Sequence, residues 1–445
     1  MLGYYLQLAV RSLRRNPVLT TLMITAVGVG IGASMTMLTN LRAMTGDPIP
    51  DKSSQLFVPQ IDVWGPDSRH AGGGAVSNRL PDTLTYRDAM AFMRAHRGVR
   101  QSVMYSFGMD VDPGAGRPLF AAGLAAYADF FSLFDVPFAR GGPWGAAEDE
   151  ARANVVVLSA KLAARVFPHA SGVGETLNLE GREYRVVGVL KPWSPVPKFY
   201  DTNGSGAAFG NSEDFYVPFT NVIDRQHESW DGTHCPSRAP ADWAGLLASE
   251  CAWLQFWVEL PTAAAVSDYR TFLSNYVAEQ RRSGRFSWAP RAELHDVNDW
   301  LVQEDVVPAQ ARVNTFIALA LLVVCLINAI GLMLAKFGSR ARELGVRRAM
   351  GGSRIDIFLQ CLAETAVIGL AGGLLGLGLT AIGLAADRAL LAPGERNVAL
   401  DGLTHLDTHM LAITLTVAVA STLCAGLYPT WRASRVQPAW QLKTP

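Results

Sequence analysis

Four long runs of the chain contain no charged residue, and they constrain the fold more than any other feature of the sequence. The runs are Asn16 to Leu41, Val313 to Ala335, Thr365 to Ala386 and Thr408 to Trp431. Each run exceeds the roughly 20 residues that a helix needs to cross the hydrocarbon of a bilayer. The sequence therefore predicts transmembrane helices at residues 18–42, 311–336, 354–386 and 408–431.

A cleaved signal peptide is the alternative for the first run, because Arg11, Arg14 and Arg15 precede it. Its apolar stretch is longer than the roughly 7–15 residues of a signal-peptide core. We therefore expect this segment to be retained as a helix.

Positive charges beside the runs predict the orientation, because Lys and Arg close to the membrane ends stay in the cytoplasm. They flank the start of the first run, the interval between the second and third, and the end of the fourth. Residues 1–17, 337–353 and 432–445 are therefore expected in the cytoplasm. The loop 387–407 carries more acids than arginines and is expected outside, together with residues 43–310.

The predicted fold is an α-helical membrane protein with four transmembrane helices plus a large α+β extracytoplasmic domain inserted between helices 1 and 2. This domain, residues 43–310, is long enough for two subdomains. Thr85 is expected to cap a helix with Asp88 as its partner, and Ser267 to cap another in "SDYRTFLSNYVAEQRR".

The middle of the domain is expected to be β structure. "NVVVLS" predicts a buried strand followed by a helix in "AKLAARVF", and alternation around Glu180 and Gly181 predicts a hairpin. Residues 194–243 are rich in Gly, Asn, Ser, Asp and Pro, and we expect long surface loops there.

Two of the five cysteines, Cys235 and Cys251, lie in the predicted extracytoplasmic domain. Oxidising compartments favour disulfides, so we hypothesise a bond between them. His227 and His234 are near in sequence, but the spacing matches no standard zinc pattern, and no metal site is predicted.

Glycines four residues apart mark two helical faces of the third run. Gly369 pairs with Gly373, and Gly372 pairs with Gly376. Small residues at this spacing let a neighbouring backbone approach closely. The neighbour is either another helix of this chain or a second subunit.

Several classes of function lack support in the sequence. The chain has no G-x-x-x-x-G-K-[ST] phosphate loop, no G-x-S-x-G and no H-E-x-x-H. Its formal net charge of zero gives no case for nucleic-acid binding. The four runs carry no Asp, Glu, Lys or Arg, which ion-coupled carriers usually need at membrane depth, so these helices are expected to act mechanically. We predict no enzymatic activity for the chain itself.

The stretch "RELGVRRAMGGSRIDIFLQCLAET" resembles the cytoplasmic signature of FtsX-like permeases. The positions of that signature are occupied by Glu343, Gly345, Arg347, Arg348, Gly351, Ser353 and Arg354, with Glu364 at the acid that often begins the third span. "AAYADFFSLFDVPFARGG", "NVVVLSAKLAARVFPHASGVGETLNLEGREYRVVGVLKPW" and "DFYVPF" resemble the MacB-type periplasmic core domain, and "YPTWRASRVQPAWQLK" resembles the family's usual ending. The chain departs from the pattern at "ARGGPW" and at Glu175, which stands where Lys is frequent.

This resemblance implies a permease subunit of an ABC transporter of the MacB/FtsX/LolC kind. Only about 17 residues precede the first span, so the ATPase is expected to be a separate cytoplasmic chain. That partner would use ATP and Mg²⁺, and this chain would bind no cofactor. The family works as dimers, so a homodimer or a heterodimer with a related permease is expected, and a periplasmic adaptor protein is a further candidate partner. Abundant Arg and Ala hint at a GC-rich bacterial genome, and we expect the protein in the bacterial inner membrane.

The signature segment is expected to contain a sharp break. Gly351 and Gly352 can end a short cytoplasmic helix, because glycine tolerates the left-handed conformation found there. Ser353 is expected to cap the third span, with Asp356 as its partner.

The arginines of this segment have two interpretations. They could anchor helix ends and attract anionic lipid. The resemblance implies instead a coupling helix that docks on the ATPase. Its polar contacts would be Arg342, Glu343, Arg347 and Arg348, while Val346 and Met350 fill a groove on the partner. Leu344 lies apart from this apolar pair on a helical wheel, so no single stripe forms.

In the mechanism that this role implies, closure of the ATPase draws the coupling helices together. The first two spans then carry the movement to the extracytoplasmic domain and drive export or extraction of a substrate. Lipoprotein release uses the same architecture and is an alternative. FtsX-like signalling to a cell-wall hydrolase and a purely structural anchor are alternatives of other classes.

Overall fold

The computed structural model describes residues 8, 11–13, 15–65, 80–114, 117–169, 171–202, 207–236, 238–351, 353–390 and 408–435. The chain forms two compact units. The helical unit takes the described residues up to Thr45 and those from Val307 onward, and the unit Gly46–Val306 is here called the sheet domain.

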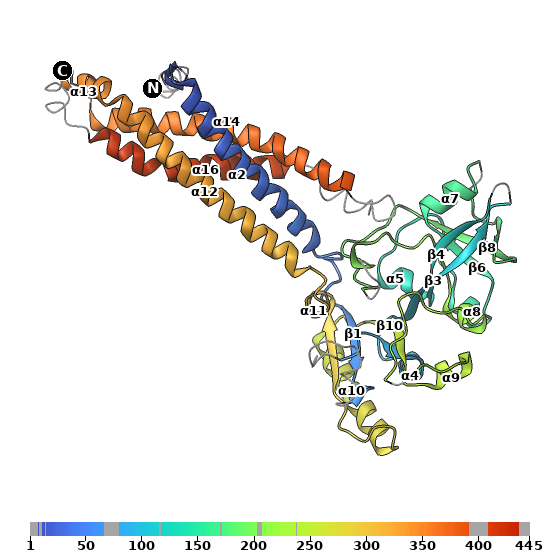
Figure 1. The fold of residues 1–445 in the computed structure, drawn as a ribbon. Coiled ribbons are helices and arrows are strands. Elements are labelled where there is room, and N and C mark those ends of the chain that lie inside the picture. The colour runs from blue at the N-terminus through green and yellow to red at the C-terminus, as the bar shows by residue number, and fades with distance from the viewer. Residues whose placement is uncertain are drawn as a thin grey trace. The chain divides into compact units, whose positions relative to one another are not determined.

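The helical unit is built from long helices that run side by side (Figure 1). They are α2 (Pro17–Met44), α12 (Ala309–Ser339), α14 (Arg354–Leu390) and α16 (Thr408–Ser434). Within the described residues, these four are the helices long and apolar enough to cross a membrane. A short helix, α13 (Ala341–Ala349), lies between α12 and α14 in the chain. Most of the predicted loop 387–407, the tail beyond residue 435 and much of the segment 1–17 lie outside the described residues.

Gly369 and Gly373 of α14 face α16. A Cβ on Gly369 would lie 2.0 Å from Thr422 Oγ1, and one on Gly373 would lie 2.8 Å from the Cβ of Ala418. Both distances are too short for real carbon contacts, so the absence of a side chain is what lets the two helices approach.

Gly372 and Gly376 face α2 on another side of the same helix. A Cβ on Gly372 would lie 2.7 Å from Val27 Cγ1, and one on Gly376 would lie 2.9 Å from Ile31 Cγ2. The two glycine pairs therefore form two seams, and both neighbours are helices of this chain.

The described strands of the sheet domain form one eleven-stranded mixed sheet (Figure 1). The strands are β1 (Leu56–Ile61), β2 (Leu84–Thr85), β3 (Gln101–Asp112), β4 (Leu119–Ala126), β5 (Phe138–Gly141), β6 (Val155–Leu158), β7 (Thr176–Leu179), β8 (Arg182–Leu190), β9 (Phe215–Pro218), β10 (Ala252–Glu259) and β11 (Ala292–Asp296). The main path runs β11-β1-β10-β3-β4-β9-β6-β8-β5, with β2 beside β10 and β7 beside β3 and β8. The helices are α4 (Tyr86–Ala95), α5 (Asp129–Leu133), α6 (Ala146–Glu150), α7 (Ala160–Val166), α8 (Phe219–Asp224), α9 (Trp243–Ala248), α10 (Ala263–Arg282) and α11 (Val297–Gln303), with a 3₁₀ turn at Ala207–Phe209.

Both faces of this sheet carry a hydrophobic core. Successive residues of β10 point to opposite faces. Phe256 packs edge-on against Phe92 of α4, with ring centroids 5.6 Å apart, whereas Trp257 packs against Phe134 beside α5 at 5.7 Å. A strand covered on both faces is apolar along its length rather than alternating. The described strands of the sheet domain thus belong to one sheet within one compact unit.

Several local predictions are confirmed. Thr85 caps α4, accepting a hydrogen bond from the Asp88 backbone N–H. The strand and helix around residues 155–166 are present. β7 and β8 form the predicted hairpin, in which Glu180 and Gly181 both have positive φ, as a tight two-residue turn requires.

The predicted cap of α10 is wrong. The helix begins at Ala263, and Thr262 rather than Ser267 is its N-cap. The Thr262 side chain accepts a 3.2 Å hydrogen bond from the Ala265 backbone N–H. Three alanines follow the cap, and alanine is the best helix former, so the helix extends one turn further toward its N-terminus.

The prediction of surface loops across residues 194–243 is also wrong in part. Lys198, Asp201 and Glu213 are all buried. The Lys198 Nζ lies 2.8 Å from Asp201 Oδ2 and 2.9 Å from Glu213 Oε1, and Asp201 also accepts hydrogen bonds from Ser106 and Gln255. Polar composition predicted exposure, but opposite charges that pair with one another can be buried together.

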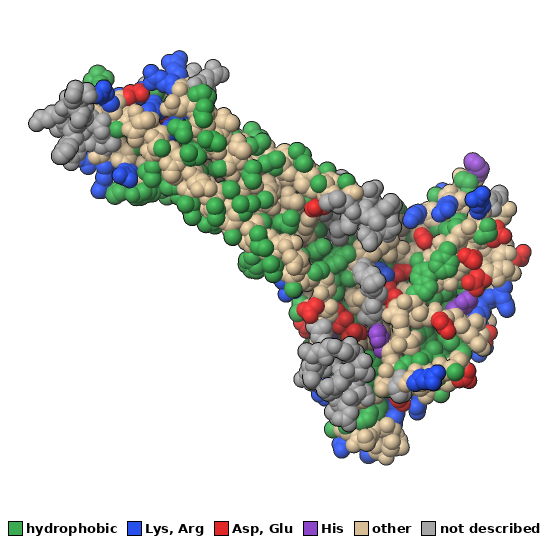
Figure 2. Space-filling view, viewed as in Figure 1, with side chains coloured by type: hydrophobic (Ala, Val, Ile, Leu, Met, Phe, Trp, Pro, Cys, Tyr) green, Lys and Arg blue, Asp and Glu red, His purple; other side chains and the backbone are tan. Residues whose placement is uncertain are grey.

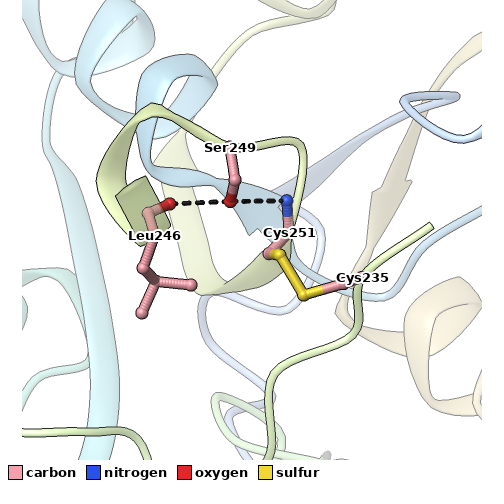
Figure 3. The surroundings of a disulfide bond; sticks show 4 residues. All are labelled: Cys235, Leu246, Ser249 and Cys251. Carbon is pink, nitrogen blue, oxygen red and sulfur yellow. Dashed lines mark hydrogen bonds between the residues drawn. A yellow bond between two sulfur atoms is a disulfide. The ribbon is translucent and has the colours of Figure 1, made fainter. Parts of the chain in front are cut away.

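The sheet domain contains the disulfide expected between Cys235 and Cys251 (Figure 3). The residues next to the bond are also held by the backbone, because His234 and Ala252 exchange two hydrogen bonds of 2.9 and 2.8 Å. The Ser249 hydroxyl donates to the Leu246 carbonyl and accepts from the Cys251 N–H. The disulfide therefore attaches an irregular segment to the first residues of β10.

We expect Gly376→Ala to destabilise the helical unit by about 1–3 kcal/mol, because the new methyl overpacks the seam with α2. Gly378→Ala on the same helix is the matched control. A Cβ there meets no atom within 4 Å, so the alanine is expected to be neutral or to stabilise the helix. Thermal unfolding in mild detergent measures both variants, and equal midpoints would contradict the seam.

Replacing both Cys235 and Cys251 by Ser is expected to lower the free energy of unfolding by about 2–5 kcal/mol, because the unfolded chain gains freedom. Non-reducing peptide mapping of the wild type is expected to show one linked peptide pair that reduction separates. Cys424→Ser, at an exposed free cysteine, is the control. Free thiols at both 235 and 251 would disprove the bond.

Burial raises the pKa of Asp231 to about 7, and the Asp201 carboxylate adds to the rise while Lys198 opposes it. The unfolded value is near 3.9. The folded chain therefore holds a proton that the unfolded chain releases, and stability falls as pH rises from about 4 to 7. We expect Asp231→Asn to flatten this dependence of the thermal midpoint. The exposed Asp268→Asn is expected to leave it unchanged, and identical pH profiles for all three proteins would refute the assignment.

Candidate coupling site

The segment from Arg340 to Arg354 contains the short helix α13 between two breaks. Arg340 interrupts the helical path after α12, with φ −103° and ψ 8°. At the other end Met350 is the C-cap and Gly351 has φ +99°, the left-handed conformation that glycine adopts without steric cost. The predicted glycine break is therefore present at Gly351, while Gly352 lies outside the described residues.

Ser353 and Asp356 form the predicted reciprocal cap at the start of α14. The Asp356 backbone N–H donates to Ser353 Oγ at 3.1 Å, and the Ser353 backbone N–H donates to Asp356 Oδ2 at 3.2 Å. The Ser353 hydroxyl also donates to the same carboxylate at 2.6 Å. Two backbone N–H groups beside the break thus gain partners, which fixes where the third long helix begins.

The two faces of α13 differ in exposure. Leu344 and Gly345 are buried, and Leu344 belongs to a core with Phe337 of α12. Val346 is 41% exposed and Met350 is 77% exposed. This division explains why the apolar residues form no single stripe, because Leu344 holds α13 to its own bundle while the other two point outward.

Glu343 is the centre of a surface ion network. Its carboxylate lies 3.1 Å from Arg15 Nη1, 3.0 Å from Arg347 Nη2 and 3.5 Å from Arg340 Nε. Arg347 also donates a 3.0 Å hydrogen bond to Gln360 of α14. Partial burial alone would raise the pKa of Glu343, but the three guanidinium groups hold it below its usual value.

The predicted coupling residues therefore divide into two groups. Those that hold α13 in place are buried or half-buried: Glu343, Gly345, Arg347 and Arg348. Those exposed on the surface are Arg342, Val346, Met350, Gly351, Ser353 and Arg354. Figure 2 shows Lys and Arg side chains gathered at this end of the helical unit, beyond a surface rich in apolar side chains.

Sequence reasoning missed several contacts that position the site. No sequence pattern assigns a role to Gln360 or Arg340, and Arg15 enters the predictions only as a charge beside the first run, although Arg15 and Arg340 both contact Glu343 and Gln360 contacts Arg347. The contacts of Arg15 and Gln360 join residues 328 and 13 positions apart, and no local pattern in the chain marks such pairs, whereas Arg340 and Glu343 are only three residues apart. Glu364 was marked by the family resemblance alone, without a partner.

The arrangement is suited to binding. Within the described parts of the chain, no group of three or more His, Cys, Asp or Glu side chains is placed to hold a metal ion. What the segment offers is an anchored helix with exposed apolar side chains beside arginines.

Comparison with known families agrees with both halves of this description. The model of the MacB-like periplasmic core domain matches residues 20–271, and the model of the FtsX-like permease C-terminal region matches residues 315–438. The chain belongs to the MacB/FtsX-type permeases. The signature that contains α13 lies within the second match.

Individual relatives of this permease are distant. The macrolide export ATP-binding/permease protein MacB of Shigella boydii is 23% identical over 447 residues, and that of Salmonella typhi is 22% identical over 455 residues. Each alignment covers 97% of this permease but 59% of the relative's length. The crystal structure of the periplasmic region of MacB from Actinobacillus actinomycetemcomitans is 12% identical, covering 59% of this permease and 94% of that chain with a TM-score of 0.34.

Proposed function

We propose that this permease is the membrane subunit of an ABC transporter and that α13 is the surface on which a cytoplasmic ATPase docks. The ATPase would be a separate chain that binds ATP and Mg²⁺. The permease would lie in the bacterial inner membrane with both termini in the cytoplasm and the sheet domain outside. The disulfide of the sheet domain supports that side, since such bonds persist in oxidising compartments.

The exposure pattern of α13 is the observation that carries this proposal. Val346 and Met350 point away from the bundle although both are large and apolar, and the exposed Arg342 lies on the same short helix. Met and Arg are enriched in protein interfaces, and apolar side chains rimmed by charge mark such surfaces.

The long helices supply a route for movement. α2 ends at Met44, just before the sheet domain begins, and α12 begins at Ala309, just after it ends. Two of the four long helices thus connect directly in the chain to the domain that would contact cargo. ATP-driven displacement of α13 would pass through them as mechanical work and drive export or extraction of a substrate without a polar conduit.

The complete transporter would contain two permease chains, identical or related, and would be able to engage an adaptor protein outside the membrane. Large apolar side chains on one face of α12 are exposed in the single chain. These include Phe316, Ile317, Val324 and Ile327. A second permease chain or lipid would cover this face.

The double variant Val346→Glu with Met350→Glu is expected to weaken binding of the cognate ATPase by at least about 30-fold, because two buried apolar contacts become unpaired charges. Val302→Glu, at an exposed valine of α11 in the sheet domain, is the matched control and is expected to bind normally. Co-purification in mild detergent and titration of stimulated ATPase activity measure the effect.

Arg347→Glu with Arg348→Glu is expected to uncouple or release the ATPase as well. This variant also breaks the Arg347 contacts to Glu343 and Gln360, so the apolar double variant is the more specific test. Unchanged co-purification and unchanged stimulation in both double variants would rule out α13 as the docking surface.

A further inference from the structure

α2 and α13 are not adjacent in the chain, because the whole sheet domain and α12 lie between them. Movement that enters at α13 must therefore reach α2 through side-chain contacts. Arg340 provides one such contact, since its Nη1 donates to the hydroxyl of Ser12, which lies shortly before α2. The contact of Arg15 with Glu343 is a second link between the same two segments.

Arg340 has a second role in its backbone, because it is the residue at which α12 ends and α13 begins. Its side chain is 11% exposed and points into the bundle rather than into solvent. The same Nη1 that contacts Ser12 donates to Glu364 Oε1 of α14 at 3.0 Å, and Nε lies 3.5 Å from Glu343 of α13. One residue at the break thus contacts three other segments.

The partner on α14 is held strongly. The Glu364 and Lys336 side chains are each 1% exposed, and Lys336 Nζ lies 3.4 Å from Glu364 Oε2. Removing one member of a buried ion pair leaves an uncompensated charge, which costs far more than losing an exposed pair. Separating Arg340 from Glu364 would therefore be costly, which favours joint movement of the break and this part of α14.

We propose that Arg340 is a positioning residue that links the tilt of α13 to α14 through Glu364 and to the start of α2 through Ser12. Bending at the break would move the guanidinium group, and its partners would have to follow or lose their hydrogen bonds. The role in energy coupling rests on the proposed docking of an ATPase, whereas the mechanical link belongs to the permease chain alone. An ATPase-free experiment can therefore test the link.

The test is hydrogen–deuterium exchange of the full chain in lipid nanodiscs without ATPase, comparing the wild type with Arg340→Gln. We expect the amides of α13, of residues 15–20 and of the helical turn around Glu364 to exchange about tenfold faster, the factor expected for loss of a hydrogen bond to a charged group. Arg312→Gln, at an exposed arginine near the other end of α12, is the matched control and is expected to leave all three regions unchanged.

The reciprocal variant, Ser12→Ala with Arg15→Gln, disrupts the link from the other end and keeps the test decisive if Arg340→Gln fails to fold. It is expected to speed exchange in α13, although neither residue lies on that helix. Faster exchange confined to the segment that carries each substitution, with the contacted segments unchanged, would overturn the proposal. So would an even increase along all four long helices, because that is general destabilisation rather than a link.

A second measurement separates this inference from the proposed function. Arg340→Gln leaves Val346 and Met350 in place, so the variant is expected to keep its bound ATPase while stimulated ATP hydrolysis falls severalfold. If Arg340→Gln speeds hydrogen–deuterium exchange but leaves stimulated ATP hydrolysis at the wild-type level, Arg340 has no role in energy coupling. If the wild type binds no ATPase, the docking proposal is refuted. The hydrogen–deuterium exchange experiment, which uses no ATPase, still tests the link through Arg340.

Discussion

Close backbone approach along α14 is the constraint on which the helical unit depends. Lipid tails are as apolar as leucine, so helices in a bilayer associate through fit rather than through exclusion of water. α14 provides that fit on two sides, with Gly369 and Gly373 against α16 and Gly372 and Gly376 against α2. Because both neighbours pack on α14, a shift of this helix reaches helices that are far apart in the sequence.

The sheet domain reaches its stability by other means. Its strand β10 is buried along its whole length, and the adjacent residues Phe256 and Trp257 pack in opposite cores. Charged side chains are buried in this interior where they form ion pairs, as Lys198 does with Asp201 and Glu213. The two units are therefore stabilised differently. Small residues allow close helix packing in the helical unit, and large aromatic residues fill the cores of the sheet domain.

The predictions from sequence succeeded where the deciding interactions are local. Charge-free runs indicate spans, Thr85 with Asp88 indicates a cap, and Glu180 with Gly181 indicates a turn, because each signal lies within a few residues. The same local logic found Gly351 and the cap at Ser353 in the coupling segment. It misplaced the start of α10, because Ser267 and Thr262 are both good caps and the alanines between them favour the earlier start. It could not find Gln360 or the partners of Glu364, because those contacts depend on which helices meet.

The disulfide carries a further consequence. Thiols stay reduced in the cytoplasm of most bacteria, so in the proposed topology Cys235 and Cys251 would bond only after this part of the chain had crossed the membrane. The other three cysteines, Cys325, Cys361 and Cys424, lie in the long helices and are free. In that topology, the oxidation state of Cys235 and Cys251 would report whether the sheet domain has been translocated. A chain whose sheet domain stayed in the cytoplasm would carry five thiols instead of three.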